Sequence, residues 1–237
     1  MGKYKVGRPA AIIFDLDGTL ADTGLDIARS ANFTRVHFGL PELTDSQAVS
    51  YVGDGVAMLL KRVLGHDVAR GVTGPEGLPV DEAMFAEAMG VFADHYGRHL
   101  LDNTRLYPGV LEILARYREI PLHLATNKPR VFTDPILEGL HIDAALDTVV
   151  CGDEAPERKP DPSHLRACLP ADMDDFSRVA VVGDSPNDVN AARALGAISV
   201  GCTYGLGAPG LVKAARPDFL IDAAGDLARI FPSRQES

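Results

Sequence analysis

The chain has 237 residues, of which 46% are hydrophobic and 24% are charged, and its formal net charge is −10. A chain of this length forms one large domain or two modest ones, each able to bury a core, and the composition is ordinary for a soluble globular enzyme. The negative charge argues against a nucleic-acid partner and against binding to a membrane surface. An anionic substrate would therefore need a local group of cations.

The three cysteines, Cys151, Cys168 and Cys202, are odd in number and widely spaced. This pattern predicts buried thiols in a reducing compartment and favours neither a disulfide framework nor a zinc site. No apolar run approaches the roughly 18 residues that span a bilayer, and the first run is too short for the core of a signal peptide. We therefore expect a cytoplasmic protein.

The first predicted element is a strand over residues 10–14, because an uninterrupted apolar run that ends in polar residues is typical of a strand buried on both faces. A Gly- and Pro-rich stretch at 71–79 is expected to be a loop. Apolar residues at helical spacing predict three helices before this loop, at 23–40, 44–51 and 56–64, and one after it, at 80–101. Residues 22–105 should then be an all-helical insertion without a strand.

From residue 107 onward, predicted helices and strands alternate. Apolar runs predict strands at 121–125, 148–151, 178–182, 197–201 and 219–221. Helical patterns lie around them, at 108–119, 129–140, 161–169, 186–195 and 222–231. This alternation predicts a parallel, doubly wound α/β sheet. We expect residues 1–21 and 106–237 to form an α/β core domain, and residues 22–105 to form a separate helical domain.

Polar residues stand where the apolar strands end. They are Asp15 and Asp17 after the first strand, Thr126, Asn127 and Lys128 after the second, Lys159 near the third, and Asp184 and Asp188 after the fourth. A parallel sheet brings the carboxyl ends of its strands to one edge. Carboxylates are ligands for a hard cation such as Mg²⁺, while a lysine and backbone N–H groups can bind phosphoryl oxygens. The pattern therefore predicts a phosphoryl-transfer site.

Each of these residues also has a plainer interpretation. An isolated Asp-x-Asp is typical of a solvated turn, Thr126 could simply end a strand, and Lys159 could be a solvated loop residue. Their joint occurrence at successive strand ends favours the catalytic interpretation.

Four motifs occur in order along the predicted core. They are Asp15-Leu-Asp17-Gly-Thr, Thr126 after a strand, Lys159 before Pro-Asp-Pro, and Gly-Asp184-x-x-x-Asp188. Together they resemble the motifs of the haloacid-dehalogenase-like superfamily of phosphohydrolases, and the resemblance covers the whole core. The helical insertion after the first motif is similar to the cap domain of the first subclass of that superfamily, so the resemblance implies that residues 22–105 are a cap.

The resemblance also implies roles for the acids. Asp15 would attack phosphorus and form an aspartyl-phosphate intermediate, and Asp17 would act as general acid and then as general base. The Asp15 carboxylate, the Asp17 main-chain carbonyl and Asp184 would bind Mg²⁺, with Asp188 as a near ligand. The second acid of the first motif favours phosphate esters over haloacids, because a leaving alkoxide needs a proton whereas a halide does not.

The remaining motifs would hold the phosphoryl group. Thr126 and the Asn127 N–H would bind its oxygens, and Lys159 would neutralise charge on them and on Asp15. The expected partner is a small phosphorylated metabolite, bound by a monomer or a homodimer.

The helical insertion carries a clue to the substrate. The stretches 51–55 and 58–62, with 107–110 and 203–205, resemble phosphoglycolate phosphatases. This implies that Gly53, Asp54 and Gly55 bind the substrate, with N–H groups at a helix start facing its carboxylate. Asp54 departs from the Asn that is frequent there. Lys61 and Arg62 are expected to be solvated.

Other functions remain open at this stage. A β-phosphoglucomutase-like phosphosugar mutase or a phosphatase of another small ester would share this core, whereas a non-enzymatic regulatory protein would be expected to lack a motif acid. Residues 205–210 match Gly-x-Gly-x-x-Gly, with Asp226 about twenty residues later, as in dinucleotide-binding folds. They follow the fifth strand and do not open a βαβ unit, which argues against dinucleotide binding. His95 and His99 lie four residues apart and are expected at the surface.

Overall fold

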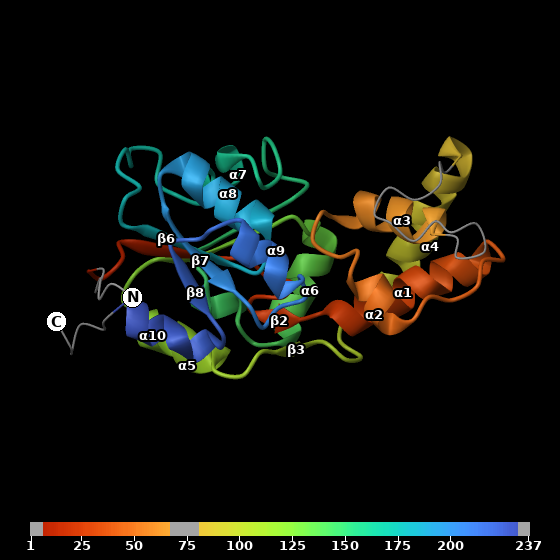
Figure 1. Ribbon diagram of the computed structural model, residues 1–237, viewed down its shortest axis with the longest axis horizontal. Helices are drawn as coiled ribbons and strands as arrows, with labels where there is room; N and C mark the ends of the chain where they lie inside the picture. Colours follow the sequence, from red (N-terminus) through yellow and green to blue (C-terminus); the bar gives the residue numbers. More distant parts are fainter. Residues whose placement is uncertain (1–6, 67–80, 232–237) are drawn as a thin grey trace. The chain divides into compact units, whose positions relative to one another are not determined.

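The computed structural model describes residues 7–66 and 81–231 (Figure 1). The expected loop at 71–79 and the first residue of the helix expected at 80–101 lie outside these ranges. The backbone divides into two compact units: a core unit, with described residues 7–22 and 105–231, and a helical unit, with described residues 23–66 and 81–104. None of the helices in the described ranges is long and apolar enough to cross a membrane.

The core unit is built on a six-stranded sheet in which every pairing is parallel. In spatial order the strands are β5 (Thr148–Cys151), β4 (Leu122–Thr126), β1 (Ala11–Phe14), β6 (Val179–Gly183), β7 (Ile198–Cys202) and β8 (Phe219–Ile221). The three central strands are buried along their whole length. Uninterrupted apolar runs form these strands because both faces of the sheet are covered. The predicted doubly wound parallel sheet is confirmed.

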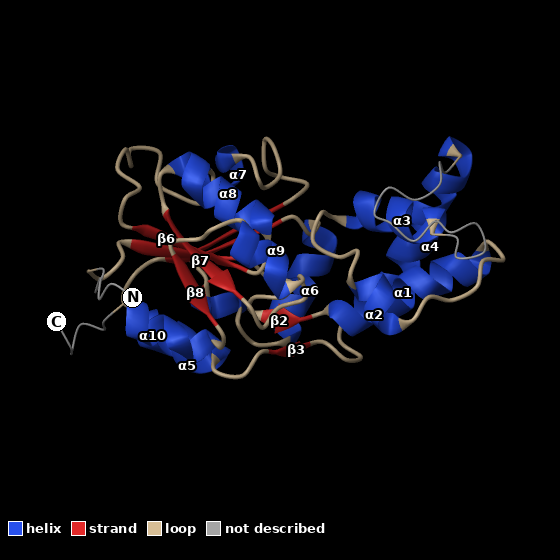
Figure 2. Cartoon of the chain, viewed as in Figure 1, coloured by secondary structure: helices blue, strands red, loops and turns tan. Residues whose placement is uncertain are grey.

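Helices cover both faces of the sheet (Figure 2). In this view α7 (Pro162–Arg166) and α8 (Pro186–Leu195) lie on one side, while α5 (Val110–Tyr117) and α10 (Leu227–Ile230) lie on the other. Two further helices, α6 (Arg130–Gly139) and α9 (Pro209–Ala214), complete the layers, together with a 3-10 turn at Asp143–Ala145. The turn and α9 are absent from the sequence-based expectations.

The chain order of the strands fixes where a ligand can bind. From β1 the chain continues to β4 and β5 on one side, then returns to β6 on the other side and continues outward to β7 and β8. The direction of winding therefore reverses beside β1 and β6. In open parallel sheets the crevice at such a reversal, at the carboxyl ends of the strands, is the usual ligand site.

Two expectations need correction. Residues 22–105 are not free of strands, because β2 (Ala21–Asp22) pairs antiparallel with β3 (Arg105–Leu106) at the ends of the insertion. The helix expected at 222–231 is wrong: it divides into a 3-10 turn, Ala224–Asp226, and α10. The Asp226 carboxylate accepts the N–H groups of Asp222 and Ala223, so helical structure begins only after Ala223.

The helical unit contains α1 (Gly24–His37), α2 (Asp45–Val49), α3 (Val56–Gly65) and α4 (Glu82–Arg98). Asp26, in the first turn of α1, is buried and joins the two ends of the insertion. Its carboxylate accepts the backbone N–H and side-chain amide of Asn103 and the N–H and hydroxyl of Thr104, at 2.7–3.0 Å. Burial raises the pKa of Asp26, but these hydrogen bonds outweigh burial and hold the pKa below its ordinary value.

We expect Asp26→Ala to lower the local free energy of unfolding of α1 and α4 by about 2–3 kcal/mol, because several buried donors lose their acceptor. Amide hydrogen exchange of these helices measures the loss. Asp45→Ala, at an exposed acid in the same unit, is the control and should change it by less than about 0.5 kcal/mol. Equal effects of the two substitutions would contradict the anchoring role of Asp26.

Candidate active site

A tight turn after β1 places the first two acids. The Asp15 N–H donates to the Val182 carbonyl at 2.9 Å, and the N–H groups of residues 19–21 converge on the Leu16 carbonyl at 3.0–3.2 Å. Gly18 has φ +80°, and a Cβ there would lie 2.0 Å from an Asp184 oxygen. Only glycine therefore allows the turn to pack against Asp184.

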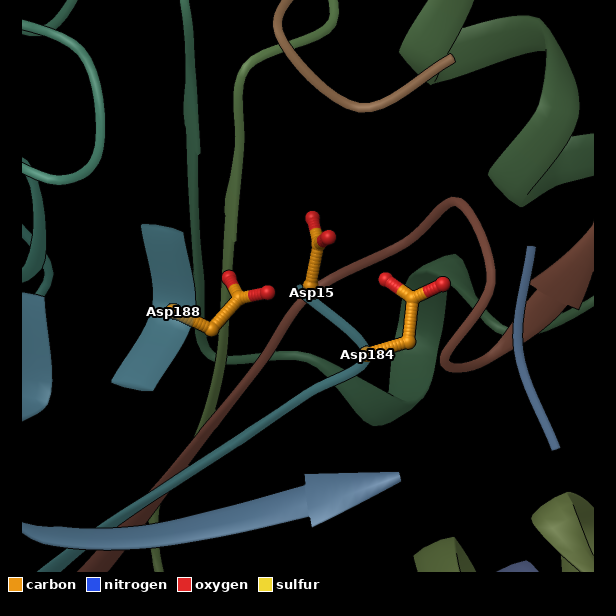
Figure 3. A group of neighbouring side chains, drawn as sticks. All are labelled: Asp15, Asp184 and Asp188. Atoms are coloured by element: carbon orange, nitrogen blue, oxygen red, sulfur yellow. The ribbon is translucent and has the colours of Figure 1, made fainter. Parts of the chain in front are cut away.

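Three carboxylates meet where this turn approaches the ends of β6 and α8 (Figure 3). Asp15, Asp184 and Asp188 each offer an oxygen, and these oxygens lie within 4.8 Å of one another. In Figure 3, Asp15 stands between the other two. Within the described ranges, this is the only group of three or more such side chains close enough to share a metal ion. The structure thus brings together three acids that the sequence predicted at one sheet edge.

The surroundings make these acids hard to ionise together. Burial raises the pKa of Asp15 to about 7, with repulsion from Asp188 and Asp17 adding to the rise and Lys159 opposing it. Burial also raises the pKa of Asp184 to about 8, with repulsion from Asp15 and Asp188 adding to it. Near neutral pH these groups would hold a proton unless a cation replaces it. Clustered carboxylate oxygens of this kind fit a hard divalent ion such as Mg²⁺.

Asp188 has hydrogen-bond donors at both of its oxygens. One oxygen accepts from the Lys159 ammonium at 2.7 Å. The other accepts the Ser185 N–H at 3.1 Å and the Ser185 hydroxyl at 2.7 Å. Asp188 therefore orients the lysine and the loop that carries Asp184.

Lys159 is buried at the centre of the cluster. Its ammonium lies 2.9 Å from an Asp15 oxygen and 2.7 Å from an Asp188 oxygen, and it donates to the Ala125 carbonyl at 2.6 Å. Its three N–H donors are matched by three acceptors. Burial lowers the pKa of Lys159, but the Asp15 and Asp188 carboxylates outweigh burial and hold the pKa above its ordinary value, so the lysine is charged at neutral pH.

Asn127 fixes the backbone of Lys159. Its side-chain oxygen accepts the Lys159 N–H at 3.0 Å, and its amide donates to the Lys159 carbonyl at 3.1 Å. His164 also accepts the Lys159 N–H at 3.3 Å through Nδ1, while its Nε2 lies 3.1 Å from the Val150 carbonyl. The sequence predicted a role for the Asn127 N–H but missed the positioning role of its side chain and that of His164.

The end of β4 also carries Thr126 and Lys128. Thr126 is buried, and its hydroxyl oxygen accepts the Lys128 N–H at 3.2 Å. The Lys128 ammonium lies 3.0 Å from an Asp17 oxygen. Sequence reasoning gave Lys128 no role, although it directly follows two residues that were assigned roles.

The glycine pattern at 205–210 supports Asp184. The Gly207 N–H donates to an Asp184 oxygen at 2.9 Å. A Cβ at Gly205 would lie 2.3 Å from the Gly18 carbonyl oxygen and 2.4 Å from the Asp184 Cβ. These glycines therefore allow close packing around a site acid, while the Asp226 carboxylate accepts the N–H groups that precede the 3-10 turn.

Gly53, Asp54 and Gly55 belong to the helical unit, where Gly55 precedes α3 with φ +87°. Asp54 pairs with Arg62 at 2.6 Å, and Arg62 also donates to the Tyr51 carbonyl at 3.3 Å. The Arg62 side chain is only 17% exposed, so the expectation that it is solvated is wrong. Asp54 and Arg62 are eight residues apart, so the second turn of α3 brings Arg62 within reach of the turn that carries Asp54.

The two histidines expected at the surface, His95 and His99, lie in the helical unit and contact each other. The rings of His95 and His99 stack with centroids 4.4 Å apart, and both residues are only partly exposed. His95 contacts the Ser30 hydroxyl at 3.0 Å, and His99 pairs with Asp102 at 2.8 Å. These partners account for the pair without a metal ion.

Comparison with known proteins gives consistent results. A family model described as haloacid dehalogenase-like hydrolase matches residues 12–202. The phosphoglycolate phosphatase of Chromobacterium violaceum is 38% identical over 197 residues, covering 82% of this chain and 85% of that protein. The one of Neisseria meningitidis is 35% identical over 230 residues, covering 95% and 93%. The crystal structure of a predicted phosphoglycolate phosphatase from Haemophilus somnus has TM-score 0.83 and 29% identity, with coverage of 97% and 99%.

We expect Gly205→Ala to weaken Mg²⁺ binding by roughly 10–100-fold, because the added methyl group would displace Asp184 or the Gly18 turn. Calorimetric titration with Mg²⁺ measures the affinity. Gly210→Ala is the matched control in the same glycine pattern, since a Cβ there meets no atom within 4 Å. Similar affinities for the two variants would contradict the supporting role of this loop.

His164 should make the stability of the core depend on pH. Burial, together with the Lys159 charge, lowers the pKa of His164 to about 4. In the unfolded chain the imidazole takes up a proton near its ordinary pKa, so stability is lost as pH falls between the two values. From pH 7.5 to pH 5 this loss should be about 2 kcal/mol.

Urea unfolding of wild type and His164→Gln at both pH values tests this. The difference in stability between the two proteins should shrink by about 2 kcal/mol at the lower pH. His141→Asn, at an exposed histidine of the same unit, should leave the pH dependence unchanged. A constant difference between wild type and His164→Gln would refute the assignment of a neutral buried imidazole.

Proposed function

The chain belongs to the haloacid dehalogenase-like hydrolase family, and we propose that it is a Mg²⁺-dependent phosphatase acting on 2-phosphoglycolate through an aspartyl-phosphate intermediate. It is a phosphoric monoester hydrolase most similar to phosphoglycolate phosphatases.

One observation carries the proposal: the charge balance at the ends of β1, β4 and β6. Two buried ammonium groups pair with three of the four acids here: Lys128 with Asp17, and Lys159 with Asp15 and Asp188, while the fourth acid, Asp184, accepts the Gly207 N–H. With all four acids ionised, four carboxylates and two ammonium groups leave a formal charge of −2, which one divalent cation would neutralise; Asp17 takes up a proton before it acts as general acid. Bound Mg²⁺ would supply positive charge that lets an anionic nucleophile approach an anionic phosphate. The Asp15 carboxylate, the Asp17 carbonyl and Asp184 would hold it, with Asp188 nearby.

The acids of the first motif then divide the chemistry. An Asp15 oxygen forms a bond to phosphorus while the ester bond breaks, and Asp17 gives its proton to the departing alkoxide. In the second step, water attacks phosphorus and gives a proton to Asp17, and the bond from Asp15 to phosphorus breaks. Thr126 and the Asn127 N–H bind phosphoryl oxygens, and Lys159 favours the ionised form of Asp15 before it attacks phosphorus.

The substrate proposal rests on the relatives and on the helical unit, which we assign as the cap. Gly53 and Gly55 would direct backbone N–H groups of the helix start toward the substrate carboxylate. An acid at position 54 would oppose such binding if its charge were uncompensated. Its ion pair with Arg62 compensates that charge and supports a carboxylate-bearing substrate.

The test compares kcat/KM for phosphate release from 2-phosphoglycolate, sugar phosphates and nucleotides. We expect 2-phosphoglycolate to exceed the other esters by about 10-fold or more, which is the factor that one good polar contact supplies. EDTA should abolish phosphate release, and added Mg²⁺ should restore it. If another ester leads, the phosphatase assignment survives and the substrate proposal fails. Isomerisation of a sugar phosphate without net phosphate release would favour the mutase instead.

The matched variant is Asp15→Asn, which should lower kcat by about 10³-fold or more with the fold intact. Asp172→Asn, at an exposed acid of the core unit, is the control and should retain activity. Unchanged turnover in Asp15→Asn would overturn the proposed nucleophile.

A further inference from the structure

The two acids of the first motif have different lysine partners. Lys159 contacts Asp15, whereas Lys128 contacts Asp17, with its ammonium 3.0 Å from an Asp17 oxygen. The Lys128 side chain is only 4% exposed, and that of Asp17 is 16% exposed. A buried ammonium needs a charged partner to offset its lost hydration, so this contact is a strong constraint on both side chains.

The backbone of Lys128 is also fixed. Its N–H donates to the Thr126 hydroxyl oxygen at 3.2 Å, and its carbonyl accepts the Gly152 N–H at 3.0 Å. A Cβ at Gly152 would lie 2.3 Å from the Asn127 carbonyl oxygen, which shows how closely the two segments pack. The lysine stem therefore starts from a rigid point on the strand end that carries Thr126.

We propose that Lys128 is a positioning residue for proton transfer: its ammonium holds one oxygen of the Asp17 carboxyl group, so that the other oxygen carries the proton toward the leaving group. This inference rests on the proposed function, because it needs Asp17 as the general acid. A carboxylate on a short side chain can rotate, and a general acid must stay within hydrogen-bond reach of the leaving oxygen. Lys128 restricts that rotation and itself transfers no proton to the substrate.

The proposal predicts a dependence on the leaving group. An alkoxide must be protonated as it leaves, whereas 4-nitrophenolate leaves without a proton. Removing the constraint on Asp17 should therefore lower kcat/KM for alkyl esters and leave kcat/KM for 4-nitrophenyl phosphate nearly unchanged. The parameter kcat/KM is the right measure, because it reports only the steps up to the first irreversible one and excludes hydrolysis of the intermediate.

The experiment measures kcat/KM of wild type and Lys128→Met with 2-phosphoglycolate, glycerol 3-phosphate and 4-nitrophenyl phosphate at saturating Mg²⁺. We expect a loss of about 10²-fold for both alkyl esters, the cost of a misplaced catalytic group, and less than about 3-fold for 4-nitrophenyl phosphate. Lys213→Met, at an exposed lysine of α9, should change none of the three values. Lys128→Gln, a smaller change, should show the same discrimination at lower amplitude and replaces Lys128→Met if that variant does not fold.

Asp17→Asn completes a double-mutant cycle. It should show the same selective loss, and adding Lys128→Met to it should cost no further activity toward alkyl esters. Equal losses for all three esters, or additive losses in the double variant, would overturn the role of Lys128. A loss confined to 2-phosphoglycolate would also overturn it, because Lys128 would then bind the substrate carboxylate. If Asp17→Asn itself shows no selectivity, the proposed function fails, independently of Lys128.

Discussion

Repulsion among four carboxylates at the carboxyl ends of β1 and β6 is the constraint on which this site depends. Each acid is held near the others by a backbone that cannot relax: Asp15 continues the pairing of β1 with β6, and Asp184 follows β6 directly. Carboxylates this close, with little water around them, would repel one another and move apart, or would take up protons. The neighbouring residues supply the compensating donors, among them Lys159, the Ser185 hydroxyl and the Gly207 N–H.

The compensating groups are themselves anchored by the sheet. Asn127 directly follows β4 and binds both polar groups of the Lys159 backbone, so a loop residue is fixed by the segment at the end of a strand. The Gly18 turn and the 205–207 loop pack against each other and against Asp184 at distances that exclude a Cβ. Glycine at these positions is thus a consequence of the charge cluster, since a larger residue would push the acid away from its partners.

The fold was largely predictable because its three central strands are buried on both faces. Such strands appear in the sequence as apolar runs with polar ends, and the parallel arrangement then implies that the ends meet. The prediction of a helix at 222–231 was wrong because an apolar pattern does not reveal side-chain hydrogen bonds. The Asp226 carboxylate accepts the N–H groups of Asp222 and Ala223, so helical structure begins only after Ala223. The strands at Asp22 and Arg105 were missed because two-residue pairings leave no periodic pattern.

Side-chain pairing within the site was beyond sequence reasoning. The predicted sheet places both Lys128 and Lys159 close to acids. Which lysine contacts which acid depends on how the segment after β4 packs against the 152–160 loop. The same holds for Arg62, whose partner Asp54 lies on a turn whose direction is set by two positive-φ glycines. The glycine pattern at 205–210 is ambiguous in the sequence for another reason, since close packing around an acid and close approach to a pyrophosphate both require glycine.

The presence of two lysines follows from the capacity of one ammonium group. Lys159 has three N–H donors, and Asp15, Asp188 and the Ala125 carbonyl engage all three. Lys159 therefore has no N–H donor left for Asp17 unless it gives up its contact with Asp15, Asp188 or the Ala125 carbonyl. A second buried cation is needed to hold Asp17, and it must come from a segment that already borders the site. The residue after Asn127 meets this condition, because the end of β4 is fixed by Asn127 on one side and by Gly152 on the other.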